Sequence, residues 1–519
     1  MMISRKLFHV LPSTGGGIRC CWRSLRTTSV ILRSSVTSET SDVTQNAKPF
    51  SEIPGPKGLP YFGTLLMYKS GQINVFKLPE TLKRWHRQYG GIVKETLAGH
   101  TVVHMFDPEF IRLVYANEDK WPRIEPLLET TQLYRQQSNM SPGLGNTNDE
   151  EWYRLRSAVQ QLMMRPKEVV PFLPGVDQVA LDFVSHLKQL RNADNEVPNF
   201  AVELARWSLE SSGISCFDTR LGFLTEKGKA EAQELIEASS TVFKLTTKLK
   251  FSLPLYKFLP TPSWKKLVAA EDVLYSGTQR HLEEALARLR QKTDNGELRE
   301  KDFRFLQYLL SREDLSLSDV STLTLSLFTD GQSTTTPTLL FTLYLLASNP
   351  SVQDKAVEEI QSLIPRSAPL TGEMVNQMSY LRACIKESVR MFPINNEISR
   401  IAKKDMVVGG YHIPAGTSIH LNNTVLFRNP TYFEEPEKYI PDRWLRDGSA
   451  QKVHPFIVLP FGHGPRMCAG RRFAEQDMAV LLTRILQNFR LEWKHSPMGL
   501  KYLTLNVPDC PAQYTFYDR

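Results

Sequence analysis

One cysteine near the C-terminal end lies in a setting that suits a reactive sulfur. Cys468 stands in the stretch FGHGPRMCAGRR, among three glycines and without a second thiol nearby. Glycine permits backbone conformations and close approaches that other side chains block. A helix is expected to begin just after Cys468, and the positive end of a helix dipole favours the thiolate. The sequence therefore predicts a loop that presents an ionised sulfur to a flat group lying close to it.

A lone sulfur limits the metal centres that the chain could hold. Zinc requires about four ligands, or three and a water, at recognisable spacings, and neither His454 nor His463 completes such a set with Cys468. Haem needs a single axial ligand from the protein, because the porphyrin supplies the in-plane nitrogens. A structural role is the alternative interpretation, since a free cysteine often packs as a small buried hydrophobe.

The same stretch resembles the haem-binding loop of the cytochromes P-450, the haem-thiolate monooxygenases, whose pattern is FxxGxRxCxG. The match is complete at Phe461, Gly464, Arg466, Cys468 and Gly470. The resemblance implies that Cys468 binds the iron of haem b and that Phe461 and Arg466 belong to the cofactor site. Thiolate ligation of this kind favours cleavage of the O–O bond.

Further motifs of this family occur in the expected order. Glu387 and Arg390 in CIKESVR stand three residues apart and share one helical face. In the family such a pair is buried against a downstream arginine, and Arg443 in PDRW occupies that place. The resemblance implies a closed charge network of Glu387, Arg390 and Arg443 that supports the haem loop; taken alone, the pair would be an ordinary surface ion pair.

The haem propionates would need cationic partners. Trp152 and Arg156 are four residues apart on a predicted helix, so the indole N–H and the guanidinium can reach one carboxylate. Arg400 and Arg466 resemble the other propionate partners of the family.

The oxygen-activating segment departs from the family pattern, which resembles Ala/Gly-Gly-x-Asp/Glu-Thr-Thr. Here TDGQSTTTP places Thr334 at the first threonine, while the acid position holds Ser333. Asp330 lies four residues before Thr334, on the same helical face, and Pro337 is expected to kink the helix. We interpret Thr334 as the residue that delivers protons, with Ser333, Asp330 or water replacing the acid; a plain helix kink is the alternative.

The elements that position these residues are mostly helical, so the sequence predicts a mainly α chain with a small β region. Apolar periodicity predicts helices over residues 77–90, 107–117, 150–164, 174–190, 198–213, 228–247, 264–292, 316–347, 350–364, 379–391 and 470–488. Ser316 and Asp319 resemble a capping box. Strands are expected at residues 92–98, 101–106, 406–408, 411–414 and 417–421. No internal repeat or linker divides residues 46–519, which are expected to form one P-450 domain.

The N-terminal segment has the composition of a mitochondrial transit peptide. Of the net charge of +8, residues 1–38 carry +6, because six basic residues precede the first acid, Glu39. Residues 1–45 are therefore read as a leader, with a disordered basic tail as the alternative. The remaining chain is nearly neutral and lacks a basic stripe with interleaved aromatics, which argues against nucleic-acid binding. The scattered cysteines favour a reducing compartment.

The resemblance to the mitochondrial branch implies partners. Its members take electrons from NADPH through a reductase and an acidic [2Fe-2S] ferredoxin, and they use a basic pair that matches Arg382 and Lys386. Arg471 and Arg472 would add positive charge to this docking face, although a solvated basic face is the alternative. Residues 243–260 alternate apolar groups and lysines where the family builds a lid, so they are expected to touch the inner mitochondrial membrane from the matrix side. An ordinary loop is the other interpretation.

The expected activity is insertion of one atom of O2 into a C–H bond of a lipophilic molecule, by resemblance a sterol or steroid. The segments near residues 125–145 and 394–400 are expected to line the pocket, and Asn395, Asn396 and Glu397 are candidates to meet a substrate hydroxyl. Two alternatives remain at this point. A haem-thiolate isomerase or dehydratase would need neither Thr334 nor ferredoxin, and a non-catalytic sterol- or haem-binding protein would need no proton relay.

Overall fold

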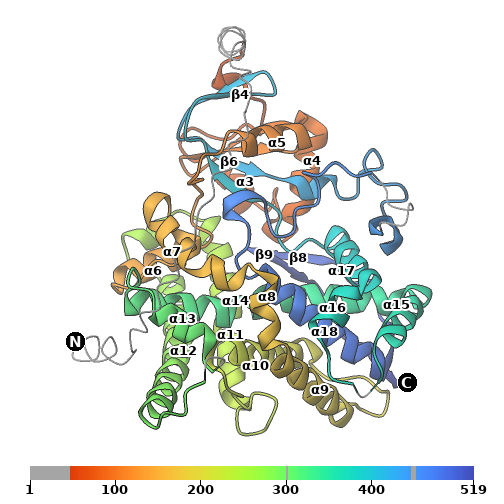
Figure 1. Cartoon of the computed structure of the whole chain (residues 1–519). Helices are drawn as coiled ribbons and strands as arrows, with labels where there is room; N and C mark the ends of the chain where they lie inside the picture. Colours follow the sequence, from red (N-terminus) through yellow and green to blue (C-terminus); the bar gives the residue numbers. More distant parts are fainter. Residues whose placement is uncertain (1–46, 300–301, 367, 446–451) are drawn as a thin grey trace, which may run out of the picture.

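The computed structural model describes residues 47–299, 302–366, 368–445 and 452–519. Helices make up most of this part, and the strands form small sheets among them (Figure 1). The prediction of a mainly α chain with a small β region is therefore confirmed. The predicted leader, residues 1–45, lies outside the described residues.

The long helices agree with the predicted ranges. The α-helices are α3 (Leu65–Lys69), α4 (Leu78–Tyr89), α5 (Pro108–Ala116), α6 (Glu129–Gln137), α7 (Asp149–Met163), α8 (Pro166–Val169), α9 (Leu173–Leu190), α10 (Phe200–Phe217), α11 (Lys229–Lys250), α12 (Pro262–Asp294), α13 (Arg304–Leu310), α14 (Leu317–Ser348), α15 (Pro350–Leu363), α16 (Gly372–Gln377), α17 (Ser379–Met391) and α18 (Arg471–Asn488). The sequence did not predict α3, α8, α13 and α16, because helices this short repeat the apolar period too few times. It also did not predict α6, whose residues ETTQLYRQQ are mostly polar and show no apolar period.

The largest sheet joins strands from both ends of the chain. Its strand order is β1 (Ile92–Leu97), β2 (His100–Met105), β6 (Ser418–Leu421) and β3 (Ile398–Ile401). Strands β1 and β2, both expected from the sequence, form an antiparallel hairpin, whereas β2 pairs with β6 in parallel. The inward side chains of this sheet pack with α5, and Figure 1 shows this unit above the main helical body.

The remaining strands form two-stranded ladders. They are β4 (Met406–Val408) with β5 (Tyr411–Ile413), β7 (Phe489–Glu492) with β10 (Thr515–Asp518), and β8 (Leu500–Leu503) with β9 (Leu505–Pro508). The expectation of strands in only two regions was wrong, since β7 to β10 follow α18. Strands of four residues give little alternation from which to recognise them.

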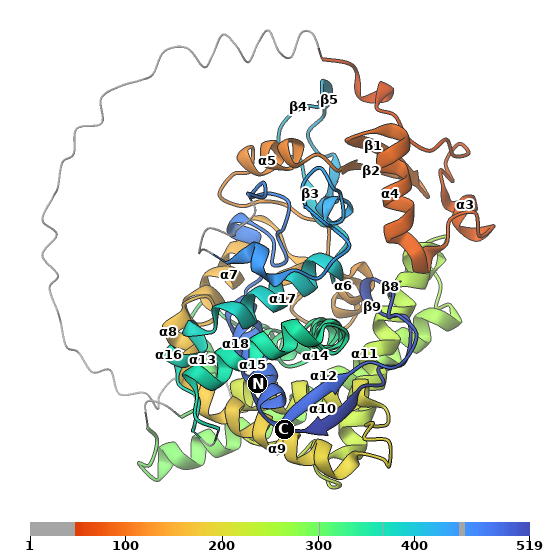
Figure 2. The same cartoon turned by 90° about the vertical axis from the view of Figure 1, so that its right-hand side faces the viewer.

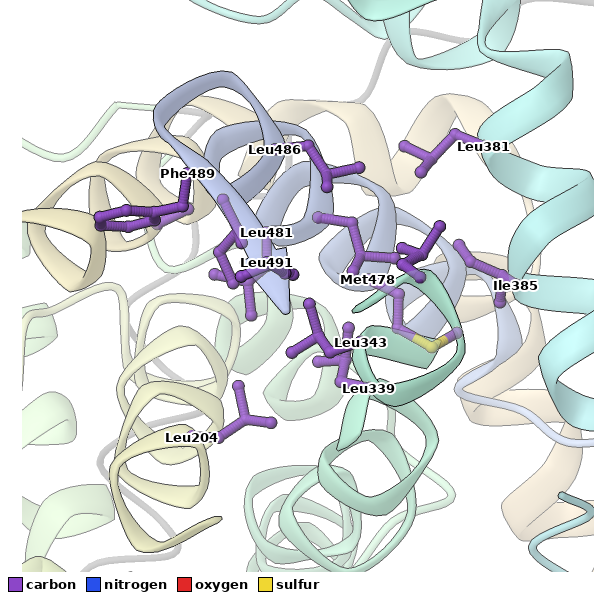
Figure 3. Packing of buried hydrophobic residues seen from close by; sticks show 14 of the residues in the cluster. Leu204, Leu339, Leu343, Leu381, Ile385, Met478, Leu481, Leu486, Phe489 and Leu491 are labelled. Atoms are coloured by element: carbon purple, nitrogen blue, oxygen red, sulfur yellow. The ribbon is translucent and has the colours of Figure 1, made fainter. Parts of the chain in front are cut away.

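Helix α14 runs through the centre of the helical body. Its start has the predicted capping box, because Ser316 accepts from the N–H of Asp319 and Asp319 accepts from the N–H of Ser316. Farther along, Leu339 and Leu343 pack in one buried cluster with residues of α10, α17, α18 and β7 (Figure 3). Pro337 lies inside the helix. The core thus holds α14 in place against α18, the helix that follows Cys468.

None of the described helices combines the length and the apolar character that crossing a bilayer requires.

Candidate functional site

The loop that carries Cys468 is closed by its own backbone. The N–H of Cys468 donates to the carbonyl oxygen of Phe461 at 2.8 Å. Gly462 and Gly464 have φ angles of +73° and +71°, a region that strains other residue types. Helix α18 begins at Arg471, so the cysteine precedes a helix start as predicted.

The Cys468 side chain faces an interior space. It keeps accessible surface, yet burial raises the pKa of its thiol. The surrounding protein therefore encloses the Cys468 thiol without packing directly against it. The backbone N–H of Gly470 opposes this shift and the Asp330 carboxyl adds to it, while Arg156 and the N–H of Arg471 lower the pKa. The N–H groups at the start of α18 favour the thiolate, but burial outweighs them and the pKa of the thiol is raised overall.

The middle of α14 borders the same interior space. Residues 330–334 keep accessible surface, whereas residues 328–329 and 335–343 on either side are buried. A helix that crosses a core exposes such a short stretch only where an internal space lies beside it. The charge interaction between Asp330 and Cys468 places both residues at this space.

The predicted relay residues are connected through the backbone of α14. The Thr334 hydroxyl donates to the carbonyl oxygen of Asp330 at 2.8 Å, and the Ser333 hydroxyl donates to the same oxygen at 3.0 Å. Burial raises the pKa of the Asp330 carboxyl to about 6, with Arg135 opposing and Glu271 adding to the shift. An acid with this pKa can exchange protons near neutral pH.

Three arginines gather next to the cysteine loop. Burial, together with the charges of Arg400 and Arg156, lowers the pKa of Arg466 to about 9. Arg466 donates to the carbonyl oxygen of Pro122 at 2.8 Å and to Oδ1 of Asn148 at 2.7 Å. Mutual repulsion of this kind is relieved by an anion placed among the guanidinium groups.

Haem suits this arrangement. Two buried nitrogens, Nε of Arg156 and Nη1 of Arg466, have no hydrogen-bond partner among the residues that the structure describes. Buried polar groups normally have partners, and guanidinium nitrogens bind carboxylates well. The propionates of a haem bound through Cys468 would satisfy them and offset the crowded positive charge. The residues present therefore fit the group that the sequence predicts.

Trp152 and Arg156 both lie on α7, as expected, and each also makes a contact that the sequence did not indicate. The Arg466 guanidinium lies over the Trp152 ring at 4.1 Å, and Nη2 of Arg156 lies 2.8 Å from Sδ of Met164. The sequence did not indicate the stacking of Arg466 on Trp152, because the two residues come from distant segments.

Arg400, on β3, reaches the cysteine loop with its charge already paired. Its Nη2 donates to the carbonyl oxygen of His463 at 3.3 Å. Its Nε forms an ion pair with Glu118, and both side chains are largely buried. Glu118 was not identified from the sequence, since no local motif surrounds it.

The structure brings Glu387, Arg390 and Arg443 together behind the loop. Arg390 donates to both oxygens of Glu387 at 2.8 and 2.9 Å, and Nε of Arg443 lies 3.0 Å from Oε1. Glu387 and Arg390 are 0% exposed. The indole N–H of Trp444 and the N–H of Ile440 complete the shell around the carboxylate, at 2.9 and 3.1 Å. This carboxylate is fully hydrogen-bonded, as a buried charge requires.

The predicted docking residues share a surface beside the loop. Arg382 and Lys386 are exposed on α17. Lys386 lies over the ring of Trp444 at 4.0 Å. Burial lowers its pKa, and the charge of Arg471 lowers it further, so these two cations are neighbours.

The added charge from Arg471 and Arg472 is smaller than expected. Both guanidinium groups pair with Glu475, at 2.7 and 2.9 Å. A single carboxylate thus offsets one of the two charges. Glu475 stands four residues after Arg471 and three after Arg472, so the spacing on a helix could have predicted both ion pairs from the sequence.

Two of the residues expected to meet a substrate hydroxyl are engaged elsewhere. The oxygens of Glu397 pair with Nζ of Lys250 and Nδ1 of His420, each at 3.0 Å. Asn396 accepts from Nδ2 of Asn506 at 2.7 Å. That interpretation is therefore corrected for Asn396 and Glu397, which hold the end of α11 and the C-terminal strands.

The connection between α11 and α12 presents large apolar side chains to solvent. Leu255, Phe258 and Leu259 are 53%, 81% and 61% exposed. The preceding Phe251 packs against Tyr68 of α3 with ring centroids 4.5 Å apart. Figure 2 shows α3 close to this end of α11. The residues just before α3 are also apolar and exposed, namely Leu59, Tyr61 and Phe62.

Comparison with known proteins gives a consistent result. Residues 53–516 match the family described as Cytochrome P450. The chain is 40% identical over 504 residues to "Probable cytochrome P450 CYP44" of Caenorhabditis elegans, which covers 95% of this chain and 99% of that protein. It is 33% identical to "Cytochrome P450 302a1, mitochondrial" of Drosophila melanogaster, over 90% of this chain and 95% of that protein. It is 31% identical to "1,25-dihydroxyvitamin D(3) 24-hydroxylase, mitochondrial" of Mus musculus, over 90% and 89%.

Removing the carboxylate at the centre of the charge network is expected to destabilise the fold. In Glu387→Gln the buried Arg390 and Arg443 lose their counter-charge, and a broken buried ion pair costs about 3–5 kcal/mol. Denaturant unfolding measures the loss, with the exposed Glu358→Gln on α15 as the matched control. Equal stability of the two variants would show that the network contributes nothing.

Replacement of the proposed iron ligand is expected to abolish haem-thiolate spectra. Cys468→Ser removes the sulfur, so the reduced protein with carbon monoxide should lose the absorption typical of thiolate ligation. Cys510→Ser, a free cysteine away from the loop, should keep that absorption. An unchanged spectrum in Cys468→Ser would overturn the assignment of the ligand.

Proposed function

The chain belongs to the cytochrome P450 family of monooxygenases, and on that premise we propose that it is a mitochondrial enzyme that oxidises a sterol-like or steroid-like substrate. One atom of O2 enters a C–H bond, and the electrons come from NADPH through a reductase and a [2Fe-2S] ferredoxin. The observation that carries this proposal is the interior space that Cys468, the arginine cluster and residues 330–334 of α14 share.

The residues around this space would have distinct tasks. Cys468 would hold the iron, and Arg156 and Arg466 would hold the propionates and fix the plane of the porphyrin. Haem bound in this way supplies the activation of O2. The protein contributes orientation and the exclusion of water through the apolar packing around α14.

Proton delivery would depend on α14. The Thr334 hydroxyl lies on the accessible stretch and is fixed by its bond to the Asp330 carbonyl. The Asp330 carboxyl, with its pKa raised to about 6 by burial, replaces the acid that Ser333 cannot supply. Asp330 would take up protons and Thr334 would pass them on at its Oγ1 atom.

The mitochondrial location is supported by two observations. Residues 1–45 have the composition of a transit peptide, and two of the relatives carry the word mitochondrial in their names. Residues 46–519 would then form the P450 domain on the matrix side. The exposed apolar residues at 253–259 and before α3 would rest on the inner membrane, where apolar side chains and lysines favour an anionic lipid surface.

The ferredoxin would dock on the face formed by Arg382, Lys386 and Arg471. Opposite charges raise the rate of encounter and orient the partner. This face is adjacent to the cysteine loop, since Arg471 starts α18 and its guanidinium lies over the Phe461 ring. An electron would therefore enter from the side of the sulfur.

Loss of the relay hydroxyl is expected to uncouple oxidation from electron use. In Thr334→Ala we expect product per NADPH oxidised to fall by about 10-fold or more, since positioned proton transfer contributes ~100-fold or more to a rate. The measurement uses ferredoxin, its reductase, NADPH and a panel of sterols. Ser326→Ala on the same helix is the control. Coupling equal to that of the parent would remove Thr334 from the relay, and turnover without ferredoxin would refute the proposed partner.

Charge reversal on α17 is expected to weaken ferredoxin binding. We expect Lys386→Glu to lower the affinity by about 10-fold at low ionic strength and by less at high salt, because salt screens exposed charges. Lys227→Glu, on the exposed loop before α11, is the matched control. An affinity that is unchanged at every salt concentration would contradict the docking role.

A further inference from the structure

A buried arginine on α6, Arg135, lies near the charges of Glu271 and Asp330 without a direct ion pair to either of them. Arg135 is 8% exposed and donates one hydrogen bond, from Nη1 to the carbonyl oxygen of Pro142 at 2.9 Å. It forms no ion pair with the residues that the structure describes. Its Nε and Nη2 atoms do not belong to the group of completely buried nitrogens that lack a partner. A guanidinium has five N–H donors, so most of its donors remain available.

Helix α6 is fixed against α11 and α12 by its other side chains. Thr130 and Thr246 share a hydrogen bond of 2.6 Å, and Thr131 donates to the buried Glu271 at 2.5 Å. Because α6 is held in this way, the position of Arg135 is set by the fold and is not that of a mobile surface side chain.

The guanidinium lies beside α14. A methyl group added to Gly143 would come within 2.6 Å of Nη1 of Arg135 and 2.9 Å of Cγ2 of Thr322, so these atoms are close neighbours. Arg135 also lowers the pKa of Asp330, whose side chain borders the interior space. Arg135 therefore lies beside α14 at Thr322, near enough for its charge to act on Asp330 at the start of the accessible stretch that holds Thr334.

We propose that Arg135 donates a hydrogen bond to a neutral oxygen of the substrate, a carbonyl or hydroxyl group at one end of an otherwise apolar molecule. This inference rests on the proposed monooxygenase function and defines its substrate class further. The sequence placed residues 125–145 in the pocket wall without identifying this residue, because α6 itself was not predicted.

The surrounding charges favour a neutral oxygen over a carboxylate. Glu271 and Asp330 already interact with Arg135, and a substrate carboxylate would add a further negative charge to this group. Like charges at short range destabilise one another. A carbonyl or hydroxyl oxygen accepts a hydrogen bond from the guanidinium without that repulsion.

The test uses probes that the iron itself anchors. Alkylimidazoles of graded tail length, ending in a methyl ketone, a carboxylate or a plain alkyl group, are titrated into the holoenzyme and followed by the Soret shift. In the parent we expect one tail length at which the ketone binds about 10- to 100-fold more tightly than the alkyl probe, as a hydrogen bond to a charged donor predicts. Arg135→Met should abolish this preference, and Arg135→Lys should keep part of it.

The controls separate this inference from the function on which it rests. Gln136→Met, on the exposed face of α6, should keep the ketone preference. The carbon monoxide spectrum of Arg135→Met reports on haem-thiolate binding independently of the probes. Ketone and alkyl probes of equal affinity at every tail length, or a preference that survives in Arg135→Met, would overturn the role of Arg135. Tighter binding of the carboxylate would overturn the choice of a neutral oxygen.

Discussion

The site depends on the balance between one sulfur and the positive charge collected around it. Cys468 receives backbone N–H groups at the start of α18, while Arg156 and Arg466 each keep a buried nitrogen that no described part of the chain pairs with. Buried cations without counter-charges destabilise the native state. An anionic ligand that binds them stabilises it, because ligand binding to the native state is linked to folding. The protein is therefore built around a group that its own chain does not supply.

Two kinds of buried charge surround this centre, and they differ in completeness. The Glu387 carboxylate has hydrogen bonds on both oxygens and needs nothing more. The arginines next to the loop repel one another, as the lowered pKa of Arg466 shows. Satisfied charges support a structure, whereas unsatisfied ones indicate where something binds. The hydrogen bonding of the buried charges thus distinguishes the network around Glu387 from the proposed haem site, even without the sequence motifs.

Much of the fold could be predicted because long helices repeat their apolar period many times. The bounds of α14 and α18 differ from the predicted ranges by a residue, and local motifs led to Cys468, Glu387 and Arg443. Helix α6 was missed because its residues are mostly polar. The strands β3 and β7 to β10 were missed because four residues show little alternation without the glycine turns that mark β4 to β6. The partners Glu118 and Trp444 could not be found, since each contact joins residues that are far apart in the chain. Helical spacing could have revealed Glu475.

The parallel pairing of β2 with β6 has a consequence for the order in which the molecule assembles. Met105 is opposite Leu421 in this ladder, so the inner edge of the first hairpin stays unpaired until a segment more than 300 residues farther along the chain reaches it. Open strand edges invite pairing with other chains, and contacts of such long range form slowly. The ladder of β2 with β6 is therefore expected to complete late in folding, and the edge of β2 is open to other chains until then.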